Sequence, residues 1–599
     1  GQLRLESATV MGKLTMNSLL VGENLVMCST PEHPASFQEV DLAAAKINGQ
    51  LRLESATVMG KLTMNSLLVG ENLVMCSTPG RPASFEEVDL AGAKIDGQLA
   101  LEGATVKGKL GMNGLQAQHL LMRSTAERTA SFQEADLTAA KIDRQLDLAG
   151  ASFGGKLGMN GLQAQHLLMR STAERTASFQ EVDLTAAKIE GTLALEGATV
   201  TGKLTMNGLK VARDLLVSST AKYLTSFQEV ELTAAKIEGT LGLEGANIEG
   251  KLAMNGLQVG QHLLMGSTPE HPASFREVDL TAAKIDGQLN LQGATVCGKL
   301  GMHSLQVGQH LLMGGAHFKE PITLIFGCIK ANLDLSGAGF TALDLSETQI
   351  SGELRLCTLR EKLPRGRLVL RNTHAGALQD AWNEGTWRRD RRDAWPEVLQ
   401  LDGFTYDRLG GFGDDPGSEM LNRPLDWYIA WLERDEAYSP QPYEHLADIF
   451  RKAGWPTKAN KILYESRERA REKARQERLI LPLSIRQPLP GWRFIGLTVL
   501  KWTMGYGLGL RYFYSLGWAF LIALIGFIVL HETDAGPASE VGKAAYSLHE
   551  LLPLLNLTTT KVKNLPQGLA EIYFIFHQLA GYVLASFVAA GMGGLTQKS

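Results

Sequence analysis

Cysteine is scarce in this 599-residue sequence, and a strong charge of either sign is missing. The five cysteines are scattered and form no C-x-x-C pair or Cys/His cluster, which argues against a disulfide framework and a zinc site. With 59 basic and 63 acidic residues, the formal net charge of −4 argues against a nucleic-acid partner and an acidic disordered tail. Patterns typical of dinucleotide, nucleoside phosphate, haem and iron–sulfur sites are also missing. We therefore predict no cofactor, no metal and no catalytic group.

Tryptophan is missing from the first 381 residues, and Tyr223 is the only tyrosine before residue 400. Glycine, by contrast, supplies 63 residues, about 10.5% of the chain against a usual share of about 7%. At roughly 150 residues per domain, the length suggests three or four domains. The uneven composition predicts that two structurally different parts of the chain join near residues 360–400.

A repeat array fills the first 360 residues. The sequence GQLRLESATVMGKLTMNSLLVGENLVM begins at Gly1 and recurs unchanged from Gly49, and five related copies follow, giving seven repeats of 47 or 48 residues. Within each repeat the motif L-x-L-x-x-A-x-V returns about every eleven residues. Its alternation predicts short strands, and the glycine before the next motif marks a corner. We predict a mainly β fold, a right-handed parallel β-helix of about fifteen coils, with two coils per repeat and the segment STPEHPASFQE bulging from every second coil.

Equivalent positions of successive repeats stack into columns on such a solenoid. One column contains Lys13, Lys61, Lys109, Lys156, Lys203, Lys251 and Lys299, and another contains Asp41, Asp89, Asp136, Asp183 and Asp279, with Glu231 at the equivalent place. These columns form either a charged face for a partner or solvated flanks that keep the coils soluble and in register. A histidine column contains His119, His166, His262 and His310. Neighbouring histidines are two coils, or about 9.6 Å, apart, which is too far to share one metal ion.

The array resembles bacterial β-solenoids of the pentapeptide-repeat and bactofilin kind. The resemblance rests on the L-x-L motif and on triplets such as Ala135-Asp136-Leu137 and Ala331-Asn332-Leu333, although an unbroken five-residue period is missing. Some solenoids of this kind imitate DNA with dense acidic faces. Here the lysine column matches the acidic column, so the resemblance does not imply DNA mimicry.

Beyond the array, the sequence predicts a cap and a helical module. Two late apolar runs, near Leu368 and from Val398 to Tyr406, indicate final coils, and the tryptophans between them suit a cap over the open strand edges. Helical spacing then predicts helices over 425–434, 443–453 and 458–477. The segment PYEHLADIFRKAGWPTKANKIL resembles one tetratricopeptide-type helix pair, which implies a packing or partner-binding module.

Two long apolar runs near the C-terminus, at 512–530 and 572–591, are each long enough to cross a membrane. Residues 451–511 contain fourteen Lys/Arg and four Glu, whereas the loop at 531–571 contains three Lys and five acidic residues. The positive-inside rule therefore places the solenoid and the C-terminus in the cytoplasm. The segment from Trp492 to Trp502 is predicted to lie at the lipid interface, with Arg493 and Lys501 facing the headgroups.

These predictions divide the chain into eight parts. They are a β-helix array (1–360), a Trp-rich cap and linker (361–423), a tetratricopeptide-like helical module (424–480), a basic juxtamembrane segment (481–511), a first span (512–530), an extracytoplasmic loop (531–571), a second span (572–591) and a cytoplasmic tail (592–599).

The membrane end offers few candidate functional residues. His577 and Gln578 interrupt the second span, and a polar residue inside a membrane is a functional candidate by default. The loop contains AYSLHELLPLLNL, which is too short to span and either lies on the outer surface or re-enters the membrane. Two spans with a re-entrant segment suggest a channel, but the only Gly-Tyr-Gly, at residues 505–507, precedes the first span and lies on the wrong side for a potassium filter.

The stretch from LDGFTY at residue 401 through the two spans resembles an uncharacterised bacterial membrane-protein family whose members are sometimes labelled membrane-associated oxidoreductase. The resemblance implies a bacterial inner-membrane protein. No redox motif in this sequence supports the label.

We therefore predict a non-enzymatic scaffold, fixed to the bilayer, whose cytoplasmic solenoid binds a protein partner or another copy of itself. A membrane-associated oxidoreductase and a two-span channel or sensor gated by the solenoid are the alternatives. Because Gly1 begins within a strand motif, we also expect the array either to continue before Gly1 or to pair end to end with another copy.

Overall fold

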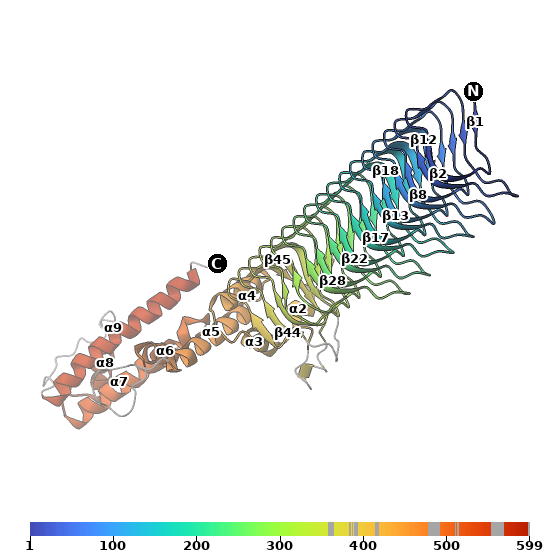
Figure 1. Cartoon of the computed structure of the whole chain (residues 1–599). Helices are drawn as coiled ribbons and strands as arrows, with labels where there is room; N and C mark the ends of the chain where they lie inside the picture. The colour runs from blue at the N-terminus through green and yellow to red at the C-terminus, as the bar shows by residue number, and fades with distance from the viewer. Residues whose placement is uncertain are drawn as a thin grey trace, which may run out of the picture. The chain divides into compact units, whose positions relative to one another are not determined.

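The computed structural model describes residues 1–357, 365–382, 385, 387–388, 393–413, 419–476, 491–509, 511, 514–552 and 568–596. The chain forms two compact parts, the solenoid part Gly1–Asn422 and the helical part Arg423–Ser599, and each is described by itself. The solenoid part is mainly parallel β-structure, and the helical part contains only helices and their connections in its described residues (Figure 1).

Successive coils of the solenoid alternate in length. Leu3 lies opposite Leu25 and Leu25 opposite Leu51, so that coils of 22 and 26 residues follow each other. The two lengths add up to one 48-residue repeat, which confirms two coils per repeat. About fifteen coils lead to the strand Gln349–Leu356, and the late apolar runs add the final coils, where Leu354, Leu378 and Leu409 stack in register. The predicted parallel solenoid is therefore confirmed.

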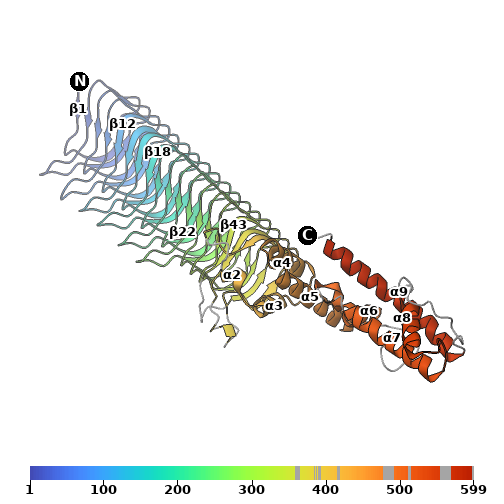
Figure 2. The ribbon, with the colours of Figure 1, turned by 180° about the vertical axis from the view of Figure 1, so that it is seen from behind.

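Two parallel sheets run along the solenoid, and short corners join them in each coil (Figure 2). In the middle repeats, the strands of the first sheet are β12 (Lys94–Ala100), β14 (Gln116–Leu121), β16 (Lys141–Asp147) and β18 (Gln163–Leu168). Those of the second sheet are β13 (Thr105–Gly111), β15 (Ser131–Asp136), β17 (Ser152–Gly158) and β19 (Ser178–Asp183). The array begins with β1 (Leu3–Arg4), and its last strand is β47 (Thr405–Leu409).

The L-x-L-x-x-A-x-V motif fills the interior of every coil. Leu51, Leu53 and Ala56 are fully buried, and the corner residue Ser55 adopts a left-handed φ of 55°. Gly103 occupies the same corner two coils later with a φ of 63°, which glycine adopts without the steric cost of a Cβ atom. Each fully buried leucine contributes roughly 1.5–3 kcal/mol, so the repeated motif stabilises the solenoid along its whole length. The corners also account for much of the excess glycine.

Aromatic residues close the end of the solenoid part. Trp387 and Trp395 are buried, and Trp395 Nε1 donates a 2.6 Å hydrogen bond to Asp380 Oδ2. The short helix α2 (Glu419–Asn422) follows the last coil. Parts of the predicted cap, residues 358–364 and several positions between 383 and 392, lie outside the described residues.

The helical part begins with α3 (Leu425–Glu433), α4 (Gln441–Lys452) and α5 (Pro456–Gln476). They pack through buried aromatic and aliphatic side chains such as Trp427, Tyr428 and Phe450. Three further helices and one 3-10 turn precede the last helix: α6 (Trp492–Met504), η1 (Gly505–Gly507), α7 (Tyr514–Glu532) and α8 (Glu540–Leu551), followed by α9 (Leu569–Thr596).

Two helices of this part are long and apolar enough to cross a membrane, over Tyr514–Glu532 and Leu569–Ser586. Helix α8, from the predicted loop, packs against both of them. Ser539 caps its N-terminus by accepting a hydrogen bond from the Gly542 amide. The second half of the predicted loop, residues 553–567, and the end of the predicted tail, residues 597–599, lie outside the described residues.

Candidate functional site

The two predicted charged columns interleave into one ladder on the second sheet. Lys13 Nζ lies 2.9 Å from Glu39 Oε1 and 3.7 Å from Asp41 Oδ2 on the next coil, and the hydrogen bond to Glu39 raises the pKa of Lys13. The same contacts recur at Lys61, Lys156 and Lys203, whereas Lys109, Lys251 and Lys299 make no ion pair with any described residue. Exposed pairs of this kind contribute about 0.2–1 kcal/mol each. Most of the ladder thus neutralises its own charge, and its role in binding stays a prediction.

Each aspartate of the acidic column also closes a turn. Asp41 Oδ1 accepts a 3.1 Å hydrogen bond from the backbone amide two residues further on, and the contact recurs at Asp89, Asp136, Asp183 and Asp279. Burial raises the pKa of Asp183, but hydrogen bonds from the hydroxyl and amide of Thr185 outweigh it, so the pKa lies below its usual value. These carboxylates therefore hold the corner of the coil.

Three of the four histidines of the predicted column accept a backbone hydrogen bond from the next coil. His166 Nδ1 lies 3.2 Å from the Thr192 amide of the next coil, and His262 and His310 make the equivalent contact. In other repeats, Asn24, Asn72 and Asp214 accept the same bond through a side-chain oxygen. Histidine, asparagine and aspartate each provide a side-chain hydrogen-bond acceptor. This explains why the three residue types replace one another in the column.

The segment that bulges from every second coil is a loop with a serine at its base. Ser171 Oγ donates a 2.6 Å hydrogen bond to the Gly197 carbonyl of the next coil and accepts a 3.0 Å bond from the Ala177 amide at the other end of the loop. The equivalent serines, Ser29, Ser77, Ser124, Ser219 and Ser267, make the same two bonds. One hydroxyl thus closes each loop and ties it to the following coil.

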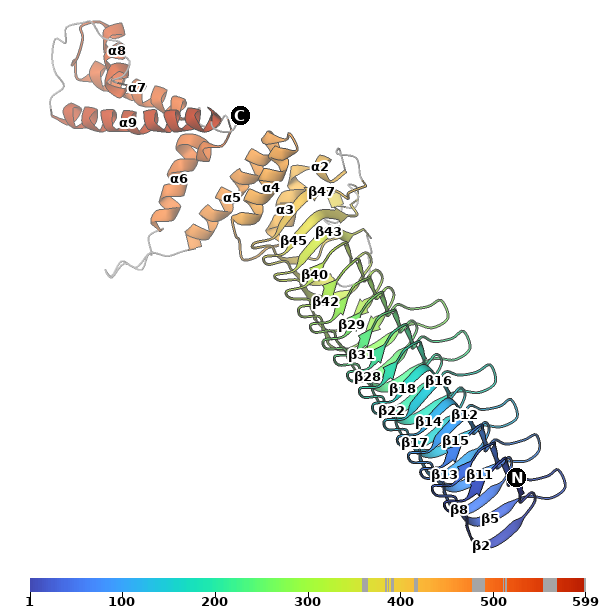
Figure 3. The same cartoon turned by 90° about the horizontal axis from the view of Figure 1, so that it is seen from above.

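The loops project from one side of the solenoid (Figure 3), and hydrogen bonds join several neighbouring loops. Arg175 in one loop donates a hydrogen bond to the Ala126 carbonyl of the preceding loop, and Lys222 in the following loop donates one to the Ala173 carbonyl. Because these contacts join residues 49 apart, they link consecutive repeats. The loops stand in a row beside the C-terminal ends of the first-sheet strands, and we call this row the wall.

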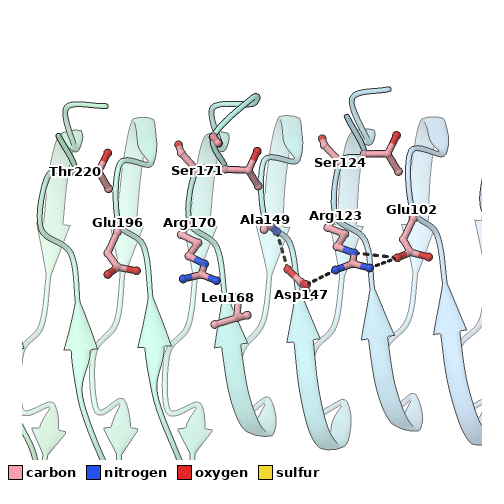
Figure 4. Close-up of a pocket in the computed structure, with 13 residues that line it drawn as sticks. Glu102, Arg123, Ser124, Asp147, Ala149, Leu168, Arg170, Ser171, Glu196 and Thr220 are labelled. Atoms are coloured by element: carbon pink, nitrogen blue, oxygen red, sulfur yellow. Dashed lines mark hydrogen bonds and ion pairs between the residues drawn. The ribbon is translucent and has the colours of Figure 1, made fainter. Parts of the chain in front are cut away.

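A groove of about 650 Å³ runs between this wall and the coils of the middle repeats (Figure 4). The floor of the groove is a column of side chains that we call the floor column. Each of its residues follows, by two positions in the sequence, a residue that pairs with its equivalent on the next coil of the first sheet. In the groove it consists of Glu102, Arg123, Ala149, Arg170 and Glu196 on five successive coils. Ser124, Thr125, Ser171, Thr172 and Thr220 line the side of the wall.

Arg123 is held by two acidic side chains of the groove. Its Nε and one terminal nitrogen lie 2.9 and 2.8 Å from Glu102 Oε1, and its other terminal nitrogen lies 3.8 Å from Asp147 Oδ2. Asp147 is only 4% exposed, and its Oδ1 accepts a 3.0 Å bond from the Ala149 amide. The side chain of Arg170, in contrast, is exposed and makes no hydrogen bond or ion pair with any described residue, although its backbone carbonyl accepts a bond from the Gly150 amide.

Sequence reasoning missed the floor column, although the repeats carry a signal for it. The residue after the Leu-x-Met, Leu-x-Leu or Leu-x-Val triplet differs among the repeats, whereas the apolar first and third residues of the triplet are kept. Along the array the floor column reads Cys28, Glu54, Cys76, Glu102, Arg123, Ala149, Arg170, Glu196, Ser218, Glu244, Gly266 and Gln292. A variable, outward position in a nearly invariant repeat indicates a surface whose chemistry differs along the solenoid.

The predicted polar residues of the second apolar helix join α9 to α8. His577 is 1% exposed, its Nε2 lies 2.9 Å from the Ser547 carbonyl oxygen, and its Nδ1 lies 3.1 Å from the Tyr573 hydroxyl. Ser547 Oγ in turn donates a 2.7 Å bond to the Ala523 carbonyl of α7. Gln578 donates a hydrogen bond to Glu550 of α8. His577 and Gln578 therefore join α9 to α8, and Ser547 joins α8 to α7.

Helix α6 presents an exposed apolar stripe. Trp492, Ile495, Val499 and Trp502 follow one another at helical spacing and are between 40% and 77% exposed. Lys501, predicted to face headgroups, instead lies with its Nζ 2.9 Å from Glu468 Oε2 of α5. The Gly-Tyr-Gly turn after α6 likewise serves α5, because the hydroxyl of its tyrosine donates a 2.7 Å bond to Glu468 Oε1.

No protein-family model, curated protein or solved structure matches the chain. The geometry of the solenoid and of the helices therefore carries the functional argument.

Proposed function

We propose that the protein is a non-enzymatic scaffold of the bacterial inner membrane, which presents the solenoid on the cytoplasmic side to a protein partner or to another copy of itself. The observation that supports it best is the combination, in one chain, of a long repeat solenoid with polar outer columns and two helices apolar enough to span a bilayer. The repeats present similar groups at regular intervals, which suits binding through many weak contacts.

The charge distribution supports the cytoplasmic side for the solenoid. The fourteen basic residues of 451–511 precede the first candidate span, and the loop that follows it is acidic. The exposed tryptophans of α6 fit the interface between headgroups and acyl chains, where aromatic side chains with a polar atom are stabilised.

Helix α8 favours a second candidate function, a two-span channel or sensor gated by the solenoid. Leu551, the last residue of α8, packs on Ala519 and Leu584, which belong to the two candidate spans. This packing of α8 on both candidate spans supports a re-entrant segment. The oxidoreductase alternative rests on the family resemblance alone.

Membrane flotation of three variants tests the scaffold proposal. Deleting residues 49–96 removes one complete repeat, and the coil pattern continues across the junction. We expect this variant to fold and to float with membranes like the full chain, but to form fewer cross-linked complexes. The double substitution Leu521→Lys and Ile525→Lys in α7 should release the chain from membranes, and Lys107→Gln on the solenoid surface serves as the control. Loss of flotation or folding on deletion of the repeat contradicts a modular scaffold.

A further inference from the structure

The two arginines of the groove occupy copies of one sequence. Both follow the segment KLGMNGLQAQHLLM, and both are followed by STAERTASFQE. Arg123 and Arg170 therefore leave the solenoid in the same direction, and they differ in what the preceding coil offers them. That coil carries Glu102 before Arg123 but Ala149 before Arg170.

The pair formed by Arg123 shows what this position accommodates. A carboxylate on the preceding coil receives two nitrogens of the guanidinium at 2.9 and 2.8 Å. Both nitrogens share one carboxylate oxygen, Glu102 Oε1, and charge-assisted bonds of this type are stronger than hydrogen bonds between neutral groups. In the next repeat, Ala149 stands at the position equivalent to Glu102, and the nearest acidic residue is Asp147, two residues earlier in the sequence. Asp147 contacts Arg123, not Arg170.

We propose that Arg170 binds a carboxylate side chain of a protein partner, which takes the place above Ala149 that Glu102 fills beside Arg123. Ala149 has no side chain beyond Cβ to occupy this place, and it lines the groove together with Arg170. The inference rests on the proposed function, because it names the chemistry of the partner that the solenoid receives.

The neighbours of Arg170 define the partner further. Asp147 and Glu196 lie on the coils to either side and make the groove acidic apart from its two arginines. These carboxylates repel a phosphate dianion or the successive phosphates of a nucleic-acid backbone more strongly than a single carboxylate, because the repulsion grows with the charge of the ligand. A polypeptide segment with one acidic residue next to a basic residue is attracted by Arg170 and by Glu196, whereas Asp147 is only 4% exposed and already contacts Arg123. The wall of loops limits the groove on one side, which suits an extended segment.

Peptide binding to the full chain in detergent micelles tests the site. The probe is a fluorescent nonapeptide, Ser-Gly-Lys-Gly-Glu-Gly-Lys-Gly-Ser with blocked ends, and its partner probe carries Gln in place of Glu. Fluorescence anisotropy should give a Kd about tenfold lower for the Glu peptide than for the Gln peptide, the size expected for one charged hydrogen-bonded contact. Arg170→Gln should remove this difference.

Ala149→Glu is the sharper variant, because it supplies the carboxylate from within the chain. Glutamate stands at the equivalent place at Glu54, Glu102, Glu196 and Glu244, so the coil accepts it without a change of fold. We expect this variant to keep its circular dichroism spectrum and to bind both peptides equally. Arg52→Gln, which removes an exposed ion pair with Glu54 outside the groove, is the matched control and should keep the tenfold difference.

Three results overturn the inference: equal binding of the two peptides by the unaltered chain, a difference that survives Ala149→Glu, and displacement of the Glu peptide by inorganic phosphate at a lower concentration than by acetate. Membrane flotation of the same samples shows whether a failure concerns only the Arg170 site or also the proposed scaffold function. A chain that floats and forms complexes without discriminating the peptides retains the scaffold function and loses only the site.

Discussion

Ser171 Oγ lies 2.6 Å from the carbonyl oxygen of Gly197, which belongs to the following coil. The same hydroxyl accepts a hydrogen bond from the Ala177 amide. Ser171 therefore closes its own loop and fixes this loop to the following coil. Through this relationship the loops keep a common direction along the solenoid and form the wall of the groove.

Ser171→Ala should loosen one loop without unfolding the array. The substitution leaves a donor and an acceptor unpaired, which costs about 1–3 kcal/mol. Hydrogen exchange at the Ala177 amide should accelerate by roughly 5- to 150-fold, measured by mass spectrometry of peptides across the loop. Thr176→Ala, at an exposed position of the same loop, is the control. Unchanged exchange at Ala177 contradicts the role assigned to the hydroxyl.

The solenoid should lose stability in acid. Burial raises the pKa of Asp183 and that of Asp279. Hydrogen bonds that the two carboxylates accept in the folded chain act in the opposite direction, and both pKa values lie below the usual value. A carboxyl whose pKa is lower in the folded than in the unfolded chain stabilises the fold above its unfolded pKa, and this contribution is lost as the pH falls through the folded value. The urea midpoint should therefore fall between pH 5 and pH 2–3, and Asp183→Asn should flatten part of that fall. A midpoint independent of pH in this range refutes the argument.

The exposed ladder of lysines should matter little to stability. Lys203 contacts Glu231 at 2.7 Å, but its side chain is 42% exposed. We expect Lys203→Gln to change the free energy of unfolding by less than about 1 kcal/mol. A loss of several kcal/mol in urea titrations shows instead that the ladder is a main support of the fold.

Glycine at residue 526 should be essential for the packing of α7, α8 and α9. A Cβ atom there lies 2.2 Å from Ser547 Oγ and 2.7 Å from His577 Cε1, which is far closer than real contacts allow. Gly526→Val should lower the thermal denaturation temperature in detergent by several degrees, because it separates the helices that His577 joins. Gly517→Val provides the control, since a Cβ at Gly517 in the same helix meets nothing within 4 Å. Equal denaturation temperatures for the two variants refute the assigned packing.

The periodicity of the sequence was sufficient to predict the coils, since their interior repeats one apolar pattern. Leu51, Leu53 and Ala56 are buried because the motif places them there in every coil. The groove was not predictable by the same means, because Arg123 and Arg170 are identical in local sequence and differ only in the residue that stacks beside them. Which residue stacks beside each arginine depends on the length of the coil, and this length alternates. The neighbours of Arg123 and Arg170 can therefore be identified only once the pairing of Asp147 with Leu121 and Leu168 is known.

Contacts between distant helices account for the other differences. The sequence around Lys501 is typical of a segment at the lipid interface, yet the lysine binds Glu468, which lies 33 residues away. His577 has several potential partners by sequence, and the packing of α8 against α9 selects the Ser547 carbonyl. Local patterns predict the helices themselves, but they do not determine which faces of those helices meet.

Thiol labelling tests the central claim most directly, because all five cysteines lie in the solenoid part. Cys297 and Cys357 are exposed, whereas Cys28 is buried and burial raises the pKa of Cys76 to about 11, so a maleimide reacts first with Cys297 and Cys357. With a membrane-impermeant maleimide, a membrane-attached cytoplasmic solenoid predicts labelling in inverted membrane vesicles and none in intact spheroplasts. The double substitution Cys297→Ala and Cys357→Ala should remove most of the signal. Labelling of Cys297 in intact spheroplasts, or recovery of the full chain in the soluble fraction, contradicts the account.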